Sequence, residues 1–342
     1  MSIHMVSGYS LETFGAKVAL EKSQPMIDQA LSTIDSLTPY IIDYGIADGG
    51  TALDFHSRLI ATLYERNPEA MLTFIGNDLP GNPHHELALN LEQLKHQFPE
   101  LIVLISPVSF YYQAVQNRRL DLGFSATAMH WLSRLPRKMA SHIHANQASA
   151  EEKEAYRQQA LNDFKQLMLL RAKELKSGGQ LVLVNLAEDE QGRSLGKNHT
   201  DATMFDYMKA TAQDMISDGV LPEEFMLNYN FQNYYKTRED FEEVLARPEL
   251  SSLKLVDHKV EHTACPYRAR YNENGNKQEF GEGLMKTIRS WSRHAWLTAA
   301  QQSGVSPDVA NDFYQRLQDR FTRNPEQHSM DYIHSYLHLE KK

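Results

Sequence analysis

The sequence has little cysteine, no long apolar run and no excess of basic side chains, and each shortage excludes a class of protein. One cysteine, Cys265, occurs in 342 residues, so no disulfide within the chain can form and disulfide-stapled secreted scaffolds are excluded. Apolar runs such as residues 101–105 stop far short of the roughly 18 to 20 residues that a membrane helix needs. No cluster of cysteine and histidine has the spacing of a structural zinc site.

The net charge and the first residues limit the binding partners and the cellular location that we expect. The chain carries 35 basic and 44 acidic side chains, a formal net charge of −9, and such a chain repels phosphate backbones on average. We therefore expect no nucleic-acid partner, and the short apolar runs predict no membrane partner. The sequence opens at Met1 without the charged, apolar and small-residue order of a secretion leader, so we expect a cytoplasmic protein.

What the first half does contain is an alternation of short apolar runs with helical patterns. Apolar runs bounded by turn residues predict buried strands over residues 40–43, 71–77, 101–105, 120–124 and 180–185. Apolar residues at helical spacing predict helices over residues 52–66, 85–97 and 150–176. This alternation indicates an α/β fold with a mostly parallel sheet covered on both faces, and ligands at the carboxyl ends of the strands.

The second half has a different composition. Aromatic residues and methionines gather there, and only one more strand is predicted, over residues 253–262. We expect an α/β core formed by residues 1–200 with 250–265, and a helical layer formed by residues 201–249 and 266–342. Most of the aromatic side chains in that layer belong to ordinary core, while a minority wall a pocket.

An acidic residue lies at the end of each of two predicted strands. Asp43 precedes Gly45 and a glycine-rich turn, and Asp78 precedes a Pro-Gly turn. Glycines let a backbone approach a ligand closely, and a carboxylate at a strand end can accept hydrogen bonds from both hydroxyls of a ribose. Neither a G-x-G-x-x-G pattern nor a P-loop occurs, so dinucleotides and triphosphates have no support. Taken alone, the same acids also fit a role in turns.

Two further loops carry hydroxyl and aromatic side chains. One holds Ser109 and Phe110, and the other runs from Ser125 to the adjacent pair His130 and Trp131. A lone His-Trp pair is more often packing than chemistry. No nucleophile, base and orienting group occur together, because Cys265 has no histidine at a known spacing and no G-x-S-x-G motif is present.

Taken in order, these stretches resemble the plant carboxyl methyltransferases of the SABATH family, which make methyl salicylate, methyl benzoate and methyl jasmonate and whose relatives methylate xanthine nitrogens. Residues 77–82 read Asn-Asp-Leu-Pro-Gly-Asn, as in the family, and residues 129–134 match its Leu-His-Trp-Leu-Ser-Arg/Gln motif. Weaker matches extend over almost the whole chain. The resemblance implies a Rossmann-like methyltransferase core with an α-helical cap over the active site.

The resemblance also implies a role for individual residues. Asp43 and Gly45 would lie beside the methionine portion of S-adenosylmethionine, and Asp78 would bind its ribose. The other implied cofactor contacts are Leu79, Ser109 and Phe110 at the adenine, and Tyr9 and Ser125 at the amino-acid end. The implied catalytic residues are Trp131, which would donate its indole N–H to the substrate carboxylate, and His130. The implied pocket walls are Thr127, His130, Trp131, Met204, Phe205, Tyr229 and Met285.

This assignment fits the missing catalytic base. A carboxylic acid is already ionised at pH 7, since its unperturbed pKa is about 4, so methyl transfer from a sulfonium requires alignment in a dry pocket and no proton removal. The substrate partner is therefore expected to be a small carboxylic acid, and the family likeness implies a homodimer.

Some positions depart from the family pattern. Ala16 replaces a glutamine that holds the substrate carboxylate, and Thr127 replaces a tyrosine. Leu227 stands where some members have a magnesium-binding aspartate, so we predict no metal. Replacement donors would be Lys17, His130, Tyr234 or Arg270; a charged donor would suit a di- or tricarboxylate, and none would suit an aryl or acyl acid. The departures leave open an N- or phenolic O-methyltransferase and a non-catalytic binding protein.

Overall fold

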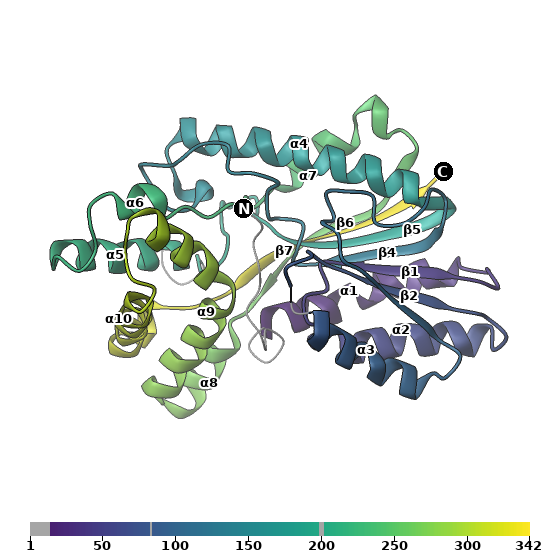
Figure 1. The fold of residues 1–342 in the computed structure, drawn as a ribbon, viewed down its shortest axis with the longest axis horizontal. Helices are drawn as coiled ribbons and strands as arrows, with labels where there is room; N and C mark the ends of the chain where they lie inside the picture. Colours follow the sequence, from purple (N-terminus) through teal and green to yellow (C-terminus); the bar gives the residue numbers. More distant parts are fainter. Residues whose placement is uncertain (1–13, 83, 198–201) are drawn as a thin grey trace.

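A seven-stranded sheet runs through the centre of the computed structural model (Figure 1), which describes residues 14–82, 84–197 and 202–342. The strands lie in the order β3-β2-β1-β4-β5-β7-β6. Their bounds are β1 Tyr40–Tyr44, β2 Thr73–Asn77, β3 Ile102–Ser106, β4 Leu120–Ala126, β5 Leu175–Leu186, β6 Leu253–Thr263 and β7 Tyr332–Lys341.

The first five strands are parallel, and β7 alone runs against its neighbours β5 and β6. Chain order reverses between β1 and β4, because β2 and β3 lie on one side of β1 and the later strands on the other. Asp43 near the carboxyl end of β1 is in register with Gly76 of β2 and Phe124 of β4. A reversal of this kind opens a crevice at the carboxyl ends of the strands, where doubly wound folds bind ligands.

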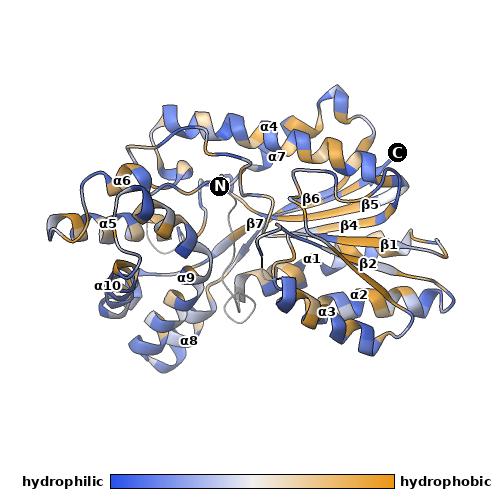
Figure 2. Cartoon of the chain, viewed as in Figure 1, coloured by the Kyte–Doolittle hydropathy of each residue, from blue (hydrophilic) through white to orange (hydrophobic). Residues whose placement is uncertain are grey.

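Helices cover both faces of the sheet (Figure 1). Helices α1 (Phe14–Ser32), α2 (Leu53–Arg66) and α3 (His84–Gln97) lie on one face, and α4 (Ala150–Glu174) and α7 (Arg238–Leu245) lie on the other. In α2 the side chains of Phe55, Leu59 and Leu63 share one buried face at helical spacing. Figure 2 shows the same pattern, with apolar strands between helices whose outer faces are polar.

The remaining helices form a separate group beyond one end of the sheet (Figure 1). They are α5 Met204–Ser217, α6 Phe225–Asn228, α8 Pro266–Asn274, α9 Lys277–Gln302 and α10 Val309–Arg323. Their buried faces make one hydrophobic cluster rich in aromatic residues and methionine, which includes Trp296 and Phe313. This cluster accounts for most of the aromatic content of the second half, as expected.

The α/β class and the mostly parallel sheet predicted from the sequence are confirmed, and each predicted strand and helix has a counterpart. Strand β7 was not predicted: residues 332–341, which we assigned to the helical layer, lie instead inside the core sheet. Its buried positions include His334, Ser335 and His338, so the apolar run that marks a buried strand is absent. Among the described residues, no helix is both long and apolar enough to cross a membrane.

Candidate active site

A cavity of about 740 Å³ opens at the carboxyl ends of β1, β2, β3 and β4, and we call it the cofactor cavity. Of the residues predicted to bind a cofactor, those that line it are Asp43, Gly45, Asp78, Leu79, Ser109 and Phe110. The parallel strands β1, β2 and β3 thus bring together residues that are up to 67 positions apart in the chain. Tyr9 lies outside the described residues.

Gly45 makes the turn after β1 possible. Its φ is +80°, a backbone conformation that side chains disfavour, and a Cβ added there would lie 2.3 Å from the Cβ of Ala128. The Gly45 N–H donates to the Asn77 carbonyl at 2.8 Å, which joins this turn to the end of β2. Glycine at this position therefore allows both the turn and the close packing of Ala128 against it at the cavity wall.

Asp78 is held firmly by donors of the protein. Its Oδ2 accepts the Ala47 N–H at 2.5 Å, and its Oδ1 accepts the Leu79 N–H at 2.7 Å and the Asn82 Nδ2 at 2.6 Å. Burial raises the pKa of the Asp78 carboxyl, while these backbone donors act to lower it. An ionised carboxylate has about four acceptor positions, so about one remains for a ligand hydroxyl.

The sequence did not identify His56 as part of this site. His56 lies in α2, is buried, and its Nε2 is 2.8 Å from Oδ2 of Asp43. An ionised carboxylate only accepts hydrogen bonds, so His56 donates here and fixes the orientation of the carboxylate beside the cavity. A lone histidine in a helical pattern carries no sequence signal for this contact, which only packing of α2 on β1 creates.

A buried ion pair holds the loop that carries Ser109 and Phe110. Arg171 donates to the Phe110 and Tyr112 carbonyls at 3.0 Å each, and Glu174 accepts the Ala114 N–H at 2.6 Å. Arg171 and Glu174 are completely buried and also pair with each other. Because Arg171 and Glu174 already hydrogen-bond the backbone of this loop, the loop needs no rearrangement to form the cavity wall.

A second, smaller cavity of about 50 Å³ adjoins the first, and we call it the recess. Ala16, Thr127 and Trp131 line both cavities, so they mark the junction between them. The other residues of the recess are Gly15, His130, Leu186, Leu195, Asn233, Tyr235, Thr287, Trp291, Tyr332 and His334. Thr127 has a φ of +53°, and its N–H donates to the Val184 carbonyl at 2.8 Å; strained backbone at a cavity junction is typical of functional sites.

Trp131 touches every part of this region. It lines the cofactor cavity, the recess and a third cavity of about 350 Å³ that extends toward α9. Its carbonyl accepts the Tyr111 hydroxyl at 2.7 Å, and its backbone forms an antiparallel bridge with Asn233. These contacts fix its backbone while the indole remains partly exposed among the three cavities.

His130 lies next to Trp131 and faces the recess. Burial, reinforced by the positive charge of Lys236 and by His334, lowers the pKa of His130 to about 3. The imidazole is therefore neutral at pH 7, so it can donate one hydrogen bond and accept another, but it cannot serve as a cationic clamp.

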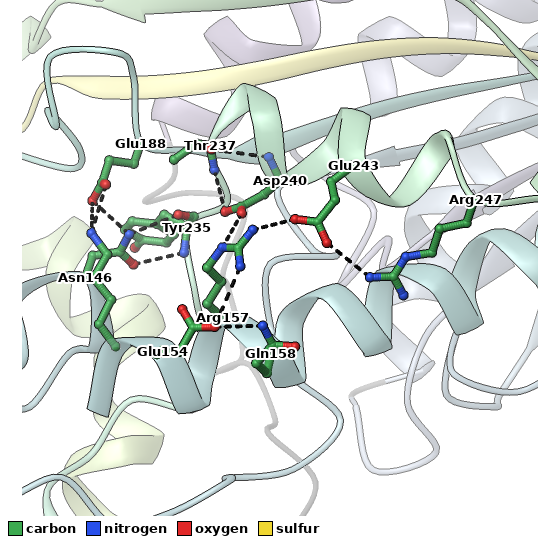
Figure 3. Close-up of polar contacts among 11 residues, drawn as sticks. Asn146, Glu154, Arg157, Gln158, Glu188, Tyr235, Thr237, Asp240, Glu243 and Arg247 are labelled. Carbon is green, nitrogen blue, oxygen red and sulfur yellow. Dashed lines mark hydrogen bonds and ion pairs between the residues drawn. The ribbon is translucent and has the colours of Figure 1, made fainter. Parts of the chain in front are cut away.

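A polar network supports the recess wall from outside (Figure 3). Asn146 pairs with both backbone groups of Tyr235, at 3.0 Å and 2.9 Å, and also donates to Glu188 at 3.0 Å. Further along the same segment, Arg157 of α4 donates to Asp240 at 2.7 Å. The network ties the chain that carries Asn233 and Tyr235 to α4, so the recess is built on rigid elements.

Several predicted residues lie elsewhere. Ser125 is buried behind the cavity, where its hydroxyl donates to the Tyr44 carbonyl at 2.7 Å. The predicted pocket walls that pack instead in the hydrophobic cluster of the helical group, outside these cavities, are Met204, Phe205, Tyr229 and Met285. Apolar residues at helical spacing occur in hydrophobic core and in pocket walls alike, so the sequence could not distinguish the two roles for these residues.

Only one of the four candidate replacement donors, His130, lines the recess. Lys17 is exposed and 3.9 Å from Asp54, and Arg270 is exposed and paired with Glu279 at 2.9 Å. Tyr234 is buried in a different cluster. No charged donor of this set therefore reaches the recess.

The sheet order, the acids at the carboxyl ends of β1 and β2 and the glycine between them define a Rossmann-like methyltransferase core. The fold matches that of loganic acid methyltransferase with SAH at a TM-score of 0.78, over 99% of this chain and 98% of that chain at 16% identity. The sequence model of the family described as "SAM dependent carboxyl methyltransferase" matches residues 6–342. The chain belongs to this family, which confirms the SABATH resemblance and its cofactor, S-adenosylmethionine.

Curated relatives agree with this family. Methyltransferase LUC1 of Fusarium sp is 29% identical over 239 residues, which are 66% of this chain and 62% of that relative. The chain thus spans about three fifths of that relative's length. Salicylate carboxymethyltransferase of Clarkia breweri is 25% identical over 280 residues, 75% of each chain.

Proposed function

We propose that this protein transfers a methyl group from S-adenosylmethionine to the carboxylate of a small organic acid, forming a methyl ester. The observation that carries the proposal is the position of Trp131, at the junction where the cofactor cavity meets the recess. A substrate carboxylate bound at Trp131 would therefore lie next to the methyl donor. The chain's membership of a carboxyl methyltransferase family supports the same reaction.

The residues present fit the cofactor. Asp43 and Asp78 supply acceptors for an ammonium group and for ribose hydroxyls, and Gly45 makes the tight turn that follows Asp43 at the cavity wall. S-adenosylmethionine supplies a methyl group on a positively charged sulfur. Asp43, oriented by His56, would hold the amino-acid end, and Leu79 and Phe110 would hold the adenine.

The protein's part in the reaction is to align the acceptor. The substrate carboxylate is ionised at pH 7, so its oxygen can attack the methyl carbon directly while the bond from carbon to sulfur breaks. No general base is required, and the neutral state of His130 is compatible with that. Trp131 would donate its indole N–H to the carboxylate, and the protein would hold the oxygen at near-attack distance away from water.

The test is methyl transfer from labelled donor to a panel of acids, followed by alkaline hydrolysis of the product. A methyl ester releases methanol on hydrolysis and an N-methyl product does not. Ester formation with any acid supports the proposal and rules out a non-catalytic binding protein. A labelled product that resists alkali would replace the proposal by N- or phenolic O-methylation, which Ala16 at the junction leaves as the second candidate.

We also propose that the helical group acts as a cap over the acceptor, and that the protein is a homodimer as the family likeness implies. Residues of α9, including Trp291, line both the recess and the third cavity, which supports the first proposal. Sedimentation at two concentrations tests the second, and a monomer at both would refute it.

A further inference from the structure

The far side of the recess carries polar atoms without partners. His334 on β7 is completely buried, and neither of its ring nitrogens has a hydrogen-bond partner among the described residues. Nδ1 of His130, which is 4% exposed, also has none. A buried polar atom left unpaired costs free energy, so a ligand that pairs with these atoms would recover it.

The recess is polar but uncharged. Its walls contain no lysine, arginine, aspartate or glutamate among the described residues. Burial lowers the pKa of His334 to about 3, as it does for His130, so both imidazoles are neutral near pH 7. Lys236, whose charge acts on His130, is not among the lining residues. A second carboxylate placed in the recess would therefore be desolvated without a cationic side chain in the wall to pair with it, which is unfavourable.

The size of the recess limits what can enter it. It offers about 50 Å³, whereas one water molecule needs about 10–15 Å³ on the same measure. A group of a few non-hydrogen atoms fits beyond the junction. Each neutral imidazole presents one donor and one acceptor nitrogen, and a hydroxyl, which both donates and accepts, matches that pair.

We propose that His130 and His334 select an acid that carries a hydroxyl group remote from its carboxylate, so that the substrates are small hydroxy monocarboxylic acids. This inference rests on the proposed function, because it places the carboxylate at Trp131 and the hydroxyl in the recess. His334 is then a specificity-determining residue on a strand that also completes the core sheet. The assignment chooses between the two substrate types left open above: an acid without a second charge is favoured over a dicarboxylate.

The experiment compares matched acids on the purified full chain. One set is pentanoate, 5-hydroxypentanoate and glutarate, and another is benzoate, 3-hydroxybenzoate and isophthalate. Ester formation is measured as kcat/KM, and binding of each acid to the protein saturated with S-adenosylhomocysteine is measured by calorimetry. In at least one set the hydroxy acid should be preferred at least about tenfold over both of its relatives, since a site built around a hydroxyl rejects analogues that lack it.

Variants connect this preference to the histidines. His334→Phe should remove most of the preference by weakening the hydroxy acid, and His334→Asn, which keeps a donor and an acceptor, should retain part of it. The matched control is His338→Phe, because His338 is also buried on β7 but hydrogen-bonds to Gln180 at 2.7 Å, outside the recess. Binding of S-adenosylhomocysteine should be unchanged in all three variants, which shows that they fold.

Two results would overturn the inference: no selective binding of a hydroxy acid by the wild type, or the same selectivity in His334→Phe as in the wild type. Selective binding without ester formation would instead refute the proposed function and leave the assignment of the recess in place. The two failures are therefore distinguishable.

Discussion

Replacing Asp78 by asparagine tests the cofactor site most directly. Three of the roughly four acceptor positions of this carboxylate are taken by Ala47, Leu79 and Asn82, so a ribose would gain about one charge-assisted hydrogen bond. Such a bond contributes about 2 kcal/mol. Since about 1.36 kcal/mol corresponds to a tenfold change in the dissociation constant, its loss weakens binding about 30-fold. Titration calorimetry with S-adenosylhomocysteine on the wild type and on Asp78→Asn measures this directly.

Stability should fall as well, because asparagine keeps one acceptor oxygen and its Nδ2 must face at least one of the buried donors Ala47, Leu79 and Asn82. Burial raises the pKa of the Asp78 carboxyl, so removing a desolvated charge offsets part of that loss. The control is Asp121→Asn, which alters a buried carboxylate that accepts the Tyr40 N–H at 2.8 Å and Lys176 at the amino end of β4. That variant should bind S-adenosylhomocysteine like the wild type. If Asp78→Asn is folded and loses less than threefold in affinity, Asp78 does not bind the cofactor.

Three further predictions concern residues around the two cavities. His56→Phe should weaken binding of S-adenosylhomocysteine about tenfold in calorimetry, because Asp43 loses its orienting donor. Trp131→Phe should lower kcat for ester formation at least about tenfold and leave cofactor affinity within about twofold, since the indole N–H and part of the ring are lost while an aromatic ring remains beside the cofactor cavity. Burial depresses the pKa of His130 and of His334 to about 3, below the roughly 6.5 of an unfolded chain. The unfolded state therefore binds more protons between these values, and the free energy of unfolding should fall as pH drops from about 6.5 toward 3. Urea unfolding of His334→Phe should show a pH slope smaller by about 1.4 kcal/mol per pH unit in that interval.

Each of these predictions has a contradicting outcome. His56→Gln keeps a donor and should bind more tightly than His56→Phe; equal losses would mean that His56 only fills space. A Trp131→Phe enzyme with unchanged kcat would remove the indole N–H from the proposed mechanism. An unchanged pH slope in His334→Phe would show that His334 is protonated as readily in the folded chain as in the unfolded one.

The predicted cofactor residues came from local motifs together with the family resemblance, and six of the eight line one cavity. Asp43 and Asp78 follow apolar runs, and parallel strands bring their carboxyl ends to one edge, so chain order and strand type together placed both acids in one crevice. Gly45 was predicted from its place in a glycine-rich turn after a strand, and its φ of +80° explains why that turn needs glycine. Ser125 was placed beside the cofactor by resemblance alone, and in the structure it supports β1 from behind.

The acceptor half could not be predicted in this way. Apolar residues at helical spacing are expected both in a pocket wall and in hydrophobic core. In the structure, residues 204, 205 and 285 pack in the hydrophobic core of the helical group. His334 lies 204 positions from His130, 334 − 130, and only the pairing of β7 with β5 brings its strand into the sheet beside the junction. The polar residues of β7, such as His334 in the recess wall, also interrupt the apolar run from which a buried strand is predicted.

Sequence alone therefore established the α/β class, because short-range patterns encode strands, strand ends and tight turns. Its resemblance to the SABATH family supplied the methyl donor and the residues predicted to bind it. The helix that orients Asp43, the strand that carries His334 and the uncharged character of the recess depended on tertiary packing. The physical reason is that burial and partner choice are properties of residues far apart in the chain: a histidine acquires a depressed pKa, and an aspartate its orientation, only from the neighbours that folding brings against it.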